Sequence, residues 1–421
     1  MLLFLLVAHL AFTQEPPSSL PDQPSVKELL ERIDRLEKRV NELEANEGKP
    51  IAIRAASVAQ QPGPPGPSQQ PDTASALSAH DHMPSSELQQ VETHYPSLQI
   101  QGFGDVDFSA TDQKGSNSGF NMGQFVLHFA SALSGKVSYF GEVSFTAEPT
   151  TYAVAVERSI VRYDYNDYFK LSLGKYHTPI GYWNATFHHG AWLQTTISRP
   201  EMVKFGGSLI PVHFVGAQAE GNIPSGGLGL GYNVGLGNGR GSLFSKAGDS
   251  GDLNSDRAWV ANVYARPSRL YGLQVGGSFY GDKVSTRPGT NFNEWIAAAD
   301  VIWTKEHPEV LAEYANVHHR DLATSQTFNT TSYYVQVAYR LPGEASKWKP
   351  YYRFEYIHRP VVEPVWDFST TPSVIDLVGS LVGVRYDITN FAAFKGEYRR
   401  ARSAVNEPNV NGAFFQTAFT F

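Results

Sequence analysis

The chain has no cysteine among its 421 residues. Disulfide crosslinks and thiolate chemistry are therefore excluded. Long apolar runs are also missing: after the first dozen residues no stretch of about 20 apolar residues occurs, which excludes a helical membrane protein. The formal net charge of −7 provides no basic surface for nucleic acid. These absences remove several functional classes before any motif is considered.

The residues that are abundant favour a different kind of membrane protein. The chain has 37 glycines and 13% aromatic residues, both high for a soluble enzyme, yet its mean hydropathy is −0.30. A transmembrane β-barrel combines these properties, because its lumen-facing residues are polar while its lipid-facing residues are apolar. The composition therefore favours a barrel.

Residues 1–14 have the apolar core of a secretory signal peptide, and the small residues Ala11 and Thr13 suit cleavage after Thr13. The segment is too short to span a membrane. The basic residues that usually precede the apolar core of a signal peptide are missing, and a true first residue further upstream would explain this. The alternative is a hydrophobic tail buried in a soluble fold.

Residues 25–46 predict a short parallel coiled coil. Ser25 and Glu28 form a capping box at its start, and β-branched residues and leucines alternate along a heptad seam. The seam residues are Val26, Leu29, Ile33, Leu36, Val40 and Leu43. Three heptads alone are marginally stable, so the helix should assist an oligomer that has another interface. The seam itself favours two strands, and a single amphipathic helix is the alternative.

Residues 47–97 form a linker dominated by Ala, Gln, Ser and Pro, and this composition predicts an extended, disordered segment. His80, Asp81 and His82 fall within it. Without an ordered scaffold we interpret them as solvated linker residues and predict no metal site.

Residues 98–421 contain about sixteen strand candidates, each of the length that crosses a bilayer at a tilt. Short turns alternate with longer connections along this region. The longer connections are residues 176–211, 238–254, 282–292, 319–328 and 360–373. Short turns on one rim and long loops on the other are typical of outer-membrane barrels, with both termini on the periplasmic side. The sequence therefore predicts an all-β, 16-stranded antiparallel transmembrane barrel, with the coiled coil and linker in the periplasm.

Apolar and polar residues alternate within these strands. Tyr352, Phe354 and Tyr356 point to one face of their strand, and Arg353 and Glu355 point to the other, because side chains alternate with a period of two residues. Apolar residues outside and charges inside fit a water-filled lumen, whereas a soluble barrel has an apolar interior. The predicted lumen charges are Arg353, Glu355, Arg385, Lys395, Glu397 and Arg399. They carry both signs.

The last strand places Phe415, Phe419 and Phe421 on one face. A C-terminal Phe on an alternating strand resembles the signal read by the barrel-assembly machinery. The layout of signal peptide, coiled coil, linker and barrel is similar to the bacterial porins grouped with the phosphate-selective porins O and P. Residues 173–181 resemble that group's motif at a strand end. The resemblance implies a homotrimer in which the third long loop folds inward, but the group's ladder of basic residues is not obvious here.

Residues 176–211 are the longest interruption of the strand pattern. The segment is too rich in bulky amphipathic residues for a solvated loop, so we expect it to fold into the barrel mouth. The candidate constriction residues are His177, Trp183, His188, His189, Trp192, Arg199 and Lys204. Aromatic faces suit stacking with sugars or other small polar solutes, and a plug of aromatic packing is the alternative. Adjacent histidines point in opposite directions in extended chain, which disfavours a metal site.

The functional interpretation is a porin through which small polar solutes and ions diffuse, with modest selectivity that tilts toward anions below about pH 6.5 as histidines protonate. The alternatives are a substrate-selective anion or phosphate porin, and an outer-membrane anchor tethered to the cell wall through the coiled coil. Ser198 or Thr195 near His188 or His189 could suggest a nucleophile. No oxyanion hole accompanies them, so neither an enzyme nor a cofactor is expected. Outer-membrane lipid and the assembly machinery are the expected partners.

Overall fold

The computed structural model describes residues 95–421 except 188, 205–208, 242–243, 245–247, 288–289, 369–373, 375 and 404–406. The predicted signal peptide, the coiled-coil seam, most of the linker and His188 lie outside the described residues, and these interpretations stay predictions.

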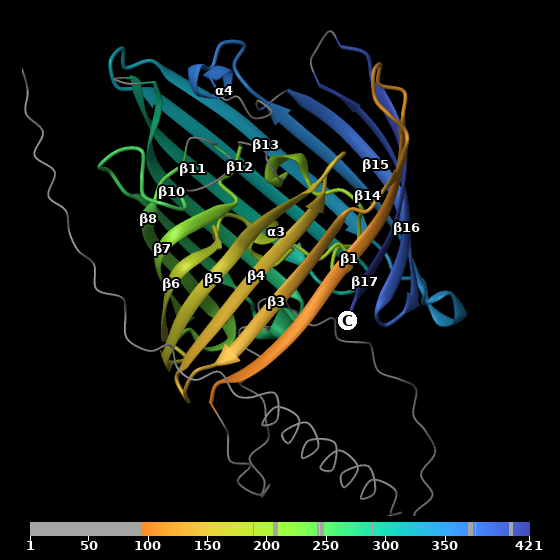
Figure 1. Ribbon diagram of the computed structural model, residues 1–421, viewed down its shortest axis with the longest axis horizontal. Coiled ribbons are helices and arrows are strands. Elements are labelled where there is room, and N and C mark those ends of the chain that lie inside the picture. Colours follow the sequence, from red (N-terminus) through yellow and green to blue (C-terminus); the bar gives the residue numbers. More distant parts are fainter. Residues whose placement is uncertain are drawn as a thin grey trace, which may run out of the picture. The chain divides into compact units, whose positions relative to one another are not determined.

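The described residues form a closed antiparallel barrel (Figure 1). Its strands are β1 (Ser97–Thr111), β2 (Gly119–Asn121), β3 (Gln124–Ala132), β4 (Val137–Ala147), β5 (Tyr152–Asn166), β6 (Phe169–His177), β7 (His213–Ile223), β8 (Leu230–Asn238), β9 (Ala258–Ala265), β10 (Leu273–Arg287), β11 (Thr290–Trp303), β12 (Glu309–Asp321), β13 (Thr327–Ala338), β14 (Trp348–His358), β15 (Leu377–Thr389), β16 (Ala392–Arg402) and β17 (Val410–Thr420). Both β2 and β3 pair with β1, so together they form one interrupted strand. The predicted sixteen strands are confirmed.

The helical elements are short. They are α3 (Tyr182–Thr186), α4 (Pro364–Phe368), η1 (Glu201–Val203), η2 (Gly226–Leu228), η3 (Ser268–Leu270) and η4 (Gly343–Ala345). Among the described residues, no helix is both long and apolar enough to cross a membrane. In Figure 1, α3 lies within the ring of strands and α4 lies on the rim that carries the long connections.

Residues 282–292 are instead mostly a continuation of β10 and β11, and the connection predicted at 319–328 is shorter than expected because β12 and β13 extend into both of its ends. Lys283 pairs with Asn293 and Val284 with Phe292, so β10 and β11 stay in register into residues 282–292. Likewise, β12 and β13 remain paired as far as Arg320 and Thr327. The polar composition of these segments suggested loops. Polar outward residues are acceptable in a strand that continues past the lipid, which explains the error.

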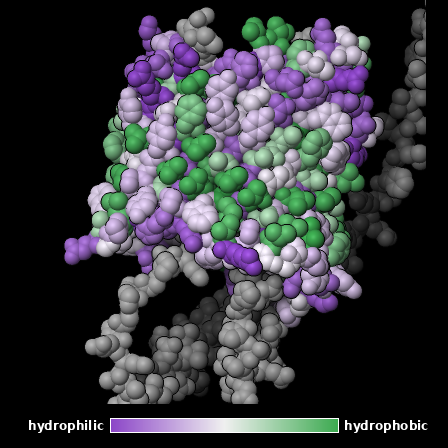
Figure 2. Space-filling model, turned by 180° about the vertical axis from the view of Figure 1, so that it is seen from behind, coloured by the Kyte–Doolittle hydropathy of each residue, from purple (hydrophilic) through white to green (hydrophobic). Residues whose placement is uncertain are grey.

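The two faces of the barrel follow the predicted alternation. Tyr352, Phe394 and Tyr398 are 47%, 42% and 48% exposed on the outside, whereas the inward Arg353 and Lys395 are fully buried. In Figure 2, hydrophobic residues spread across the middle of the visible face and strongly hydrophilic ones gather toward its upper edge. An apolar exterior around a polar interior is the arrangement of a transmembrane barrel.

The barrel closes between β1 and β17, where aromatic rings lie over glycines. Gly104 pairs with Phe419, and the chain continues to Phe421 beside Gly102. A Cβ added to Gly102 would lie 2.2 Å from the ring of Phe421, and one on Gly104 would lie 2.6 Å from the ring of Phe419. The glycines thus leave space for the rings. Phe415 packs near Phe108 on the same seam, with ring centroids 6.3 Å apart.

Candidate functional site

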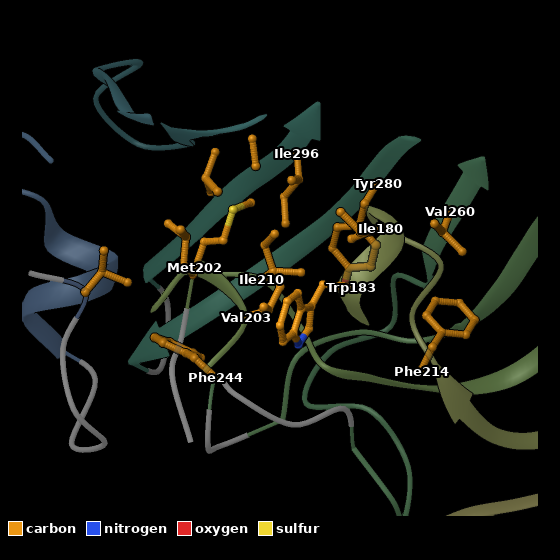
Figure 3. Packing of buried hydrophobic residues seen from close by; sticks show 14 of the residues in the cluster. Ile180, Trp183, Met202, Val203, Ile210, Phe214, Phe244, Val260, Tyr280 and Ile296 are labelled. Carbon is orange, nitrogen blue, oxygen red and sulfur yellow. The ribbon is translucent and has the colours of Figure 1, made fainter. Parts of the chain in front are cut away.

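The connection between β6 and β7 is packed against the inner wall of the barrel. Ile180, Trp183 and Ile210 from this connection are at most 1% exposed, and they belong to one cluster with the inward residues Val260 and Ile296 of the wall (Figure 3). Burial of this many apolar groups stabilises the inward position at roughly 25 cal/mol per Å² of apolar surface. The prediction that this segment folds into the barrel is therefore consistent with its packing.

The start of this connection is bound by Glu313 of β12. The carboxylate accepts the backbone N–H groups of Tyr182 and Trp183 at 2.9 and 2.8 Å, and the hydroxyl of Tyr334 donates to it as well. Gly181 precedes them with a φ of 71°, and a Cβ there would lie 2.0 Å from a carboxylate oxygen of Glu313. Glycine is needed at position 181 for both reasons.

Positively charged wall residues bind the carbonyl groups of the connection. Arg353 of β14 donates to the carbonyls of Ser198 and Arg199 at 2.9 and 3.0 Å and forms an ion pair with Glu355 at 2.6 Å. Further along the wall, Arg385 of β15 donates to the carbonyls of Trp192 and Gln194, and Lys395 of β16 to those of Ala191 and Thr196. These cations satisfy carbonyl groups that have no partner in a helix or sheet.

Negatively charged wall residues bind N–H and hydroxyl groups of the same connection. Glu397 of β16 accepts the backbone N–H of Ile197 at 3.0 Å and the hydroxyl of Ser198 at 2.9 Å. Glu355 accepts the N–H of Glu201 at 2.6 Å, and Glu309 accepts the hydroxyl of Thr195 at 2.8 Å. The two signs predicted for the lumen thus have a structural reason: a backbone segment presents acceptors and donors together.

The connection also reaches the other side of the barrel. Nδ1 of His189 lies 3.1 Å from Oε1 of Gln124 on β3, and its Nε2 lies 3.5 Å from Glu157 on β5. Leu193 packs with Phe103 and Val126. Counting β2 and β3 as one strand, β5 is the fourth strand of the ring and β13, which carries Tyr334, is the twelfth. These strands are eight positions apart in a ring of sixteen, so the connection contacts opposite sides of the wall.

Four histidines surround two buried glutamates on this second side. Nε2 of His128 and of His177 lie 3.5 and 3.8 Å from the carboxylate of Glu142. Nε2 of His189 and of His213 lie 3.5 and 3.1 Å from the carboxylate of Glu157. Among the described residues, no group of His, Asp and Glu is arranged to hold a metal ion. His128 and His213 carry no local sequence signal that marks them as site residues, although their strand positions face the lumen side.

The remaining candidate constriction residues have different surroundings. Trp183 is fully buried against Phe187 and Tyr334, with ring centroids 5.1 and 6.0 Å away, so its face is not available to a solute. Trp192 is partly buried below the guanidinium of Arg385. Position 183 therefore fits the aromatic-packing alternative rather than solute stacking.

The two basic candidates of the connection also differ. Arg199 donates to the carbonyl of Val203 at 2.9 Å. Burial lowers its pKa to about 9, while the carboxylates of Glu157 and Glu142 oppose this shift, so the guanidinium stays charged at neutral pH. The Lys204 side chain is 52% exposed and pairs with Glu201 at 3.1 Å. Of these two cations, Lys204 is the more accessible to dissolved ions.

Comparison with known proteins relates the barrel to solved outer-membrane porins and channels. The structure is similar to an anion-selective porin from Comamonas acidovorans (TM-score 0.56, 10% identity, 77% of this chain and 100% of that chain). It is also similar to the outer membrane channel DcaP of Acinetobacter baumannii (TM-score 0.55, 11% identity, 77% and 97%). A trimer form of OmpT, an outer membrane protein of Vibrio cholerae, gives a TM-score of 0.52 at 14% identity, with 77% and 99% covered.

No protein-family model and no curated protein matches the sequence. At 10–14% identity the structural similarity concerns the fold. The contacts that hold the connection between β6 and β7 against the inner wall are observed in this chain itself and are not taken from these solved structures. On these grounds the described chain is a 16-stranded barrel with the fold of outer-membrane porins.

Proposed function

We propose that the chain forms a water-filled diffusion channel for small polar solutes and ions in the bacterial outer membrane, narrowed by residues 176–211. The supporting observation is that this segment contacts opposite sides of the wall, at Glu157 on β5 and at Tyr334 on β13. A segment that crosses the lumen reduces the cross-section through which a solute passes. The solved structures with this fold are themselves named as porins and channels.

The test is to replace residues 182–209 with a short Gly-Ser turn and to record single channels in a planar bilayer. Removing the segment should widen the path, so the single-channel conductance should increase. Barrel folding is checked separately by circular dichroism in detergent. A folded barrel whose conductance is unchanged would contradict the constriction, and a folded native chain that does not conduct would favour the anchor hypothesis instead.

The proposed channel has modest ion selectivity. Selectivity in channels comes from rings of like charge at the narrow point, but here the wall cations and anions bind the connection. Arg353 and Lys395 are fully buried, and Glu397 is 4% exposed. Neighbouring charges of opposite sign largely cancel at a distance, so these wall residues create little net field for ions in the path.

The permeability ratio of chloride to potassium at pH 7.5 and pH 5.5 tests this part of the proposal. We expect weak selectivity at pH 7.5 and a shift toward chloride at pH 5.5, since histidine side chains in general gain positive charge below about pH 6.5. Strong anion selectivity at both pH values, with block by phosphate at low concentration, would favour the phosphate-porin alternative.

A homotrimer in contact with outer-membrane lipid is the proposed assembly, with residues 25–46 as an additional contact in the periplasm. One of the similar structures is described as a trimer form. Deleting residues 25–46 should weaken the oligomer without preventing insertion of the barrel, as measured by crosslinking in intact membranes. Crosslinking that stops at two subunits would favour the dimer that the heptad pattern suggests. Recognition of Phe415, Phe419 and Phe421 by the assembly machinery, and any attachment to the cell wall, are part of the same proposal.

A further inference from the structure

A second group of buried charged residues lies apart from the contacts of residues 181–201 described above. Nε of Arg240 donates to Oε1 of Glu294 at 2.7 Å, and the other Glu294 oxygen lies 2.7 Å from Nε2 of His319. Nδ1 of His319 lies 3.1 Å from Oε1 of Glu363. All four side chains are at most 1% exposed. Ionisable groups are buried this completely only when they bind one another and water is excluded.

Arg240 contacts three separate long connections. It belongs to the connection between β8 and β9 and donates through Nη1 to the carbonyl of Phe244 in the same connection. Its Nη2 donates to the carbonyl of Leu209, in the connection between β6 and β7, at 2.9 Å. Its guanidinium carbon lies 5.6 Å from the ring centroid of Trp366, in the connection between β14 and β15.

The wall holds Arg240 and Trp366 in place. The backbone N–H of Arg240 donates to Asp282 of β10 at 2.8 Å. The indole N–H of Trp366 donates to Thr330 of β13 at 2.9 Å, and its ring meets the ring of His319 edge-on at 4.7 Å between centroids. Because β10 to β13 are neighbouring strands, these contacts cover one continuous sector of the rim.

Apolar side chains fill the space around these polar contacts. Leu209, Phe244, Val365 and Trp366 are at most 3% exposed and belong to a single cluster that includes Ile210. Phe244 and Ile210 lie in the same group of packed side chains in Figure 3. With apolar groups this close and ionisable groups this buried, the space between these residues and the wall offers no path for water.

We propose that Leu209, Ile210, Arg240, Phe244 and residues 363–366 form one folded cap over the β10–β13 sector of the rim, and that Arg240 is the residue that positions it. The cap closes this sector to solutes, so they enter along the opposite sector of the mouth. The size limit for entry is then set by the edge of the cap as well as by residues 176–211. The role in entry rests on the proposed channel function, whereas the existence of the cap does not.

Because the chain has no cysteine, single thiols can report on the cap. Val365→Cys places a thiol at a fully buried position, and Val361→Cys places one at a position that is 96% exposed in the same connection. In the otherwise native full-length chain, a maleimide should label the Val361→Cys thiol quickly and the Val365→Cys thiol slowly. Equal labelling rates would overturn the cap.

The second step adds Arg240→Met, which removes every donor of the side chain and retains an apolar stem. Labelling of the Val365→Cys thiol should then accelerate about tenfold or more, as the cap opens locally. The matched control is Arg257→Met, in the same connection but 49% exposed, which should leave the rate unchanged. If Arg240→Met fails to fold, Arg240→Lys replaces it, since lysine keeps the positive charge but cannot make the forked contacts of the guanidinium. A thiol that stays protected in the folded variant would show that Arg240 does not position the cap.

Bilayer recording with polyethylene glycols of increasing size separates the cap from the channel. Arg240→Met should admit larger polymers than the native chain or Arg257→Met does. If labelling accelerates but the size limit is unchanged, the entry role is wrong while the proposed channel function stands. If no variant conducts, the channel function fails, the entry role fails with it, and the cap is judged by labelling.

Discussion

The inner wall of β12–β16 and the inner wall of β7–β10 differ in the polar side chains they carry. In the first sector these are charged, and they bind the backbone of residues 181–201, as Arg353 and Glu397 do. In the second, the side chains midway along β8–β10 are neutral and bind one another: Asn233 donates to Asn262 at 3.2 Å, and Asn262 donates to Ser278 at 3.0 Å. The ionisable His213 and Asp282 of this sector lie next to the long connections. Charged side chains occur on the wall where the inward-folded connection presents backbone groups that lack partners. Neutral amide side chains are sufficient where side chains of neighbouring strands hydrogen-bond to each other.

The largest expected effect comes from removing a charged contact of the first sector. Arg353→Met should destabilise the protein by about 3–5 kcal/mol, because Glu355 and the carbonyls of Ser198 and Arg199 remain buried without this partner. The midpoint of urea unfolding in lipid vesicles measures the loss. Single-channel recordings should also become noisier as the segment loosens.

Arg400→Met is the control for this change, since Arg400 is exposed on the outside of β16 and its loss should have little effect. If both variants unfold at the same urea concentration, the idea that charged wall residues hold the segment is wrong.

A smaller effect is expected where the segment begins. Gly181→Ala places a Cβ 2.0 Å from Glu313 in a residue with φ of 71°, so the contact of Glu313 with Tyr182 and Trp183 must shift. Gly343→Ala is the matched control: its φ is 62° but no atom lies within 4 Å of the added Cβ. The control should show only the left-handed backbone cost of about 1–2 kcal/mol. The difference between the two unfolding midpoints measures the destabilisation caused by the clash. Equal midpoints would show that the Glu313 side chain moves away without loss of stability.

The smallest effect is expected in the neutral sector. Asn262→Ala leaves Asn233 and Ser278 each without one partner and should cost about 1–3 kcal/mol. Channel conductance should change much less than with Arg353→Met, because Asn262 reaches the connection only through Ser278, which accepts the N–H of Gly181 at 3.2 Å. Asn222→Ala, at an exposed position near the end of β7, is the control. A conductance change as large as that of Arg353→Met would remove the distinction between the sectors.

Much of the fold could be predicted because each strand carries its own signal. Tyr352 and Arg353 point to opposite faces whatever lies around them, since side chains alternate along any strand. Phe419 and Phe421, which lie where β1 and β17 close the barrel, were likewise placed on one face of the last strand by their two-residue spacing. The pattern failed over most of residues 282–292 and at both ends of 319–328, where strands continue with polar residues outside. Composition there cannot distinguish a solvated strand from a solvated loop.

The candidate site was predictable only in outline. The unusual composition of residues 176–211 indicated a segment that folds against something, and the inward position of Lys395 and Glu397 followed from strand period. Their partners did not follow, because the carbonyl of Thr196 and the N–H of Ile197 are present in any sequence. His128 and His213 were missed for a similar reason: each is a single histidine in its strand, and only the barrel brings them to Glu142 and Glu157.

The sequence by itself determined the sixteen strands, the apolar outer face and the presence of both charge signs inside, since these depend on residue type and local period. The tertiary structure decided which wall residue binds which backbone group, that Trp183 packs instead of facing a solute, and that Arg240 meets Leu209 and Trp366. Closing the barrel brings together residues that are far apart in the chain. Contacts between such residues depend on the register of every strand between them, and no local pattern contains that information.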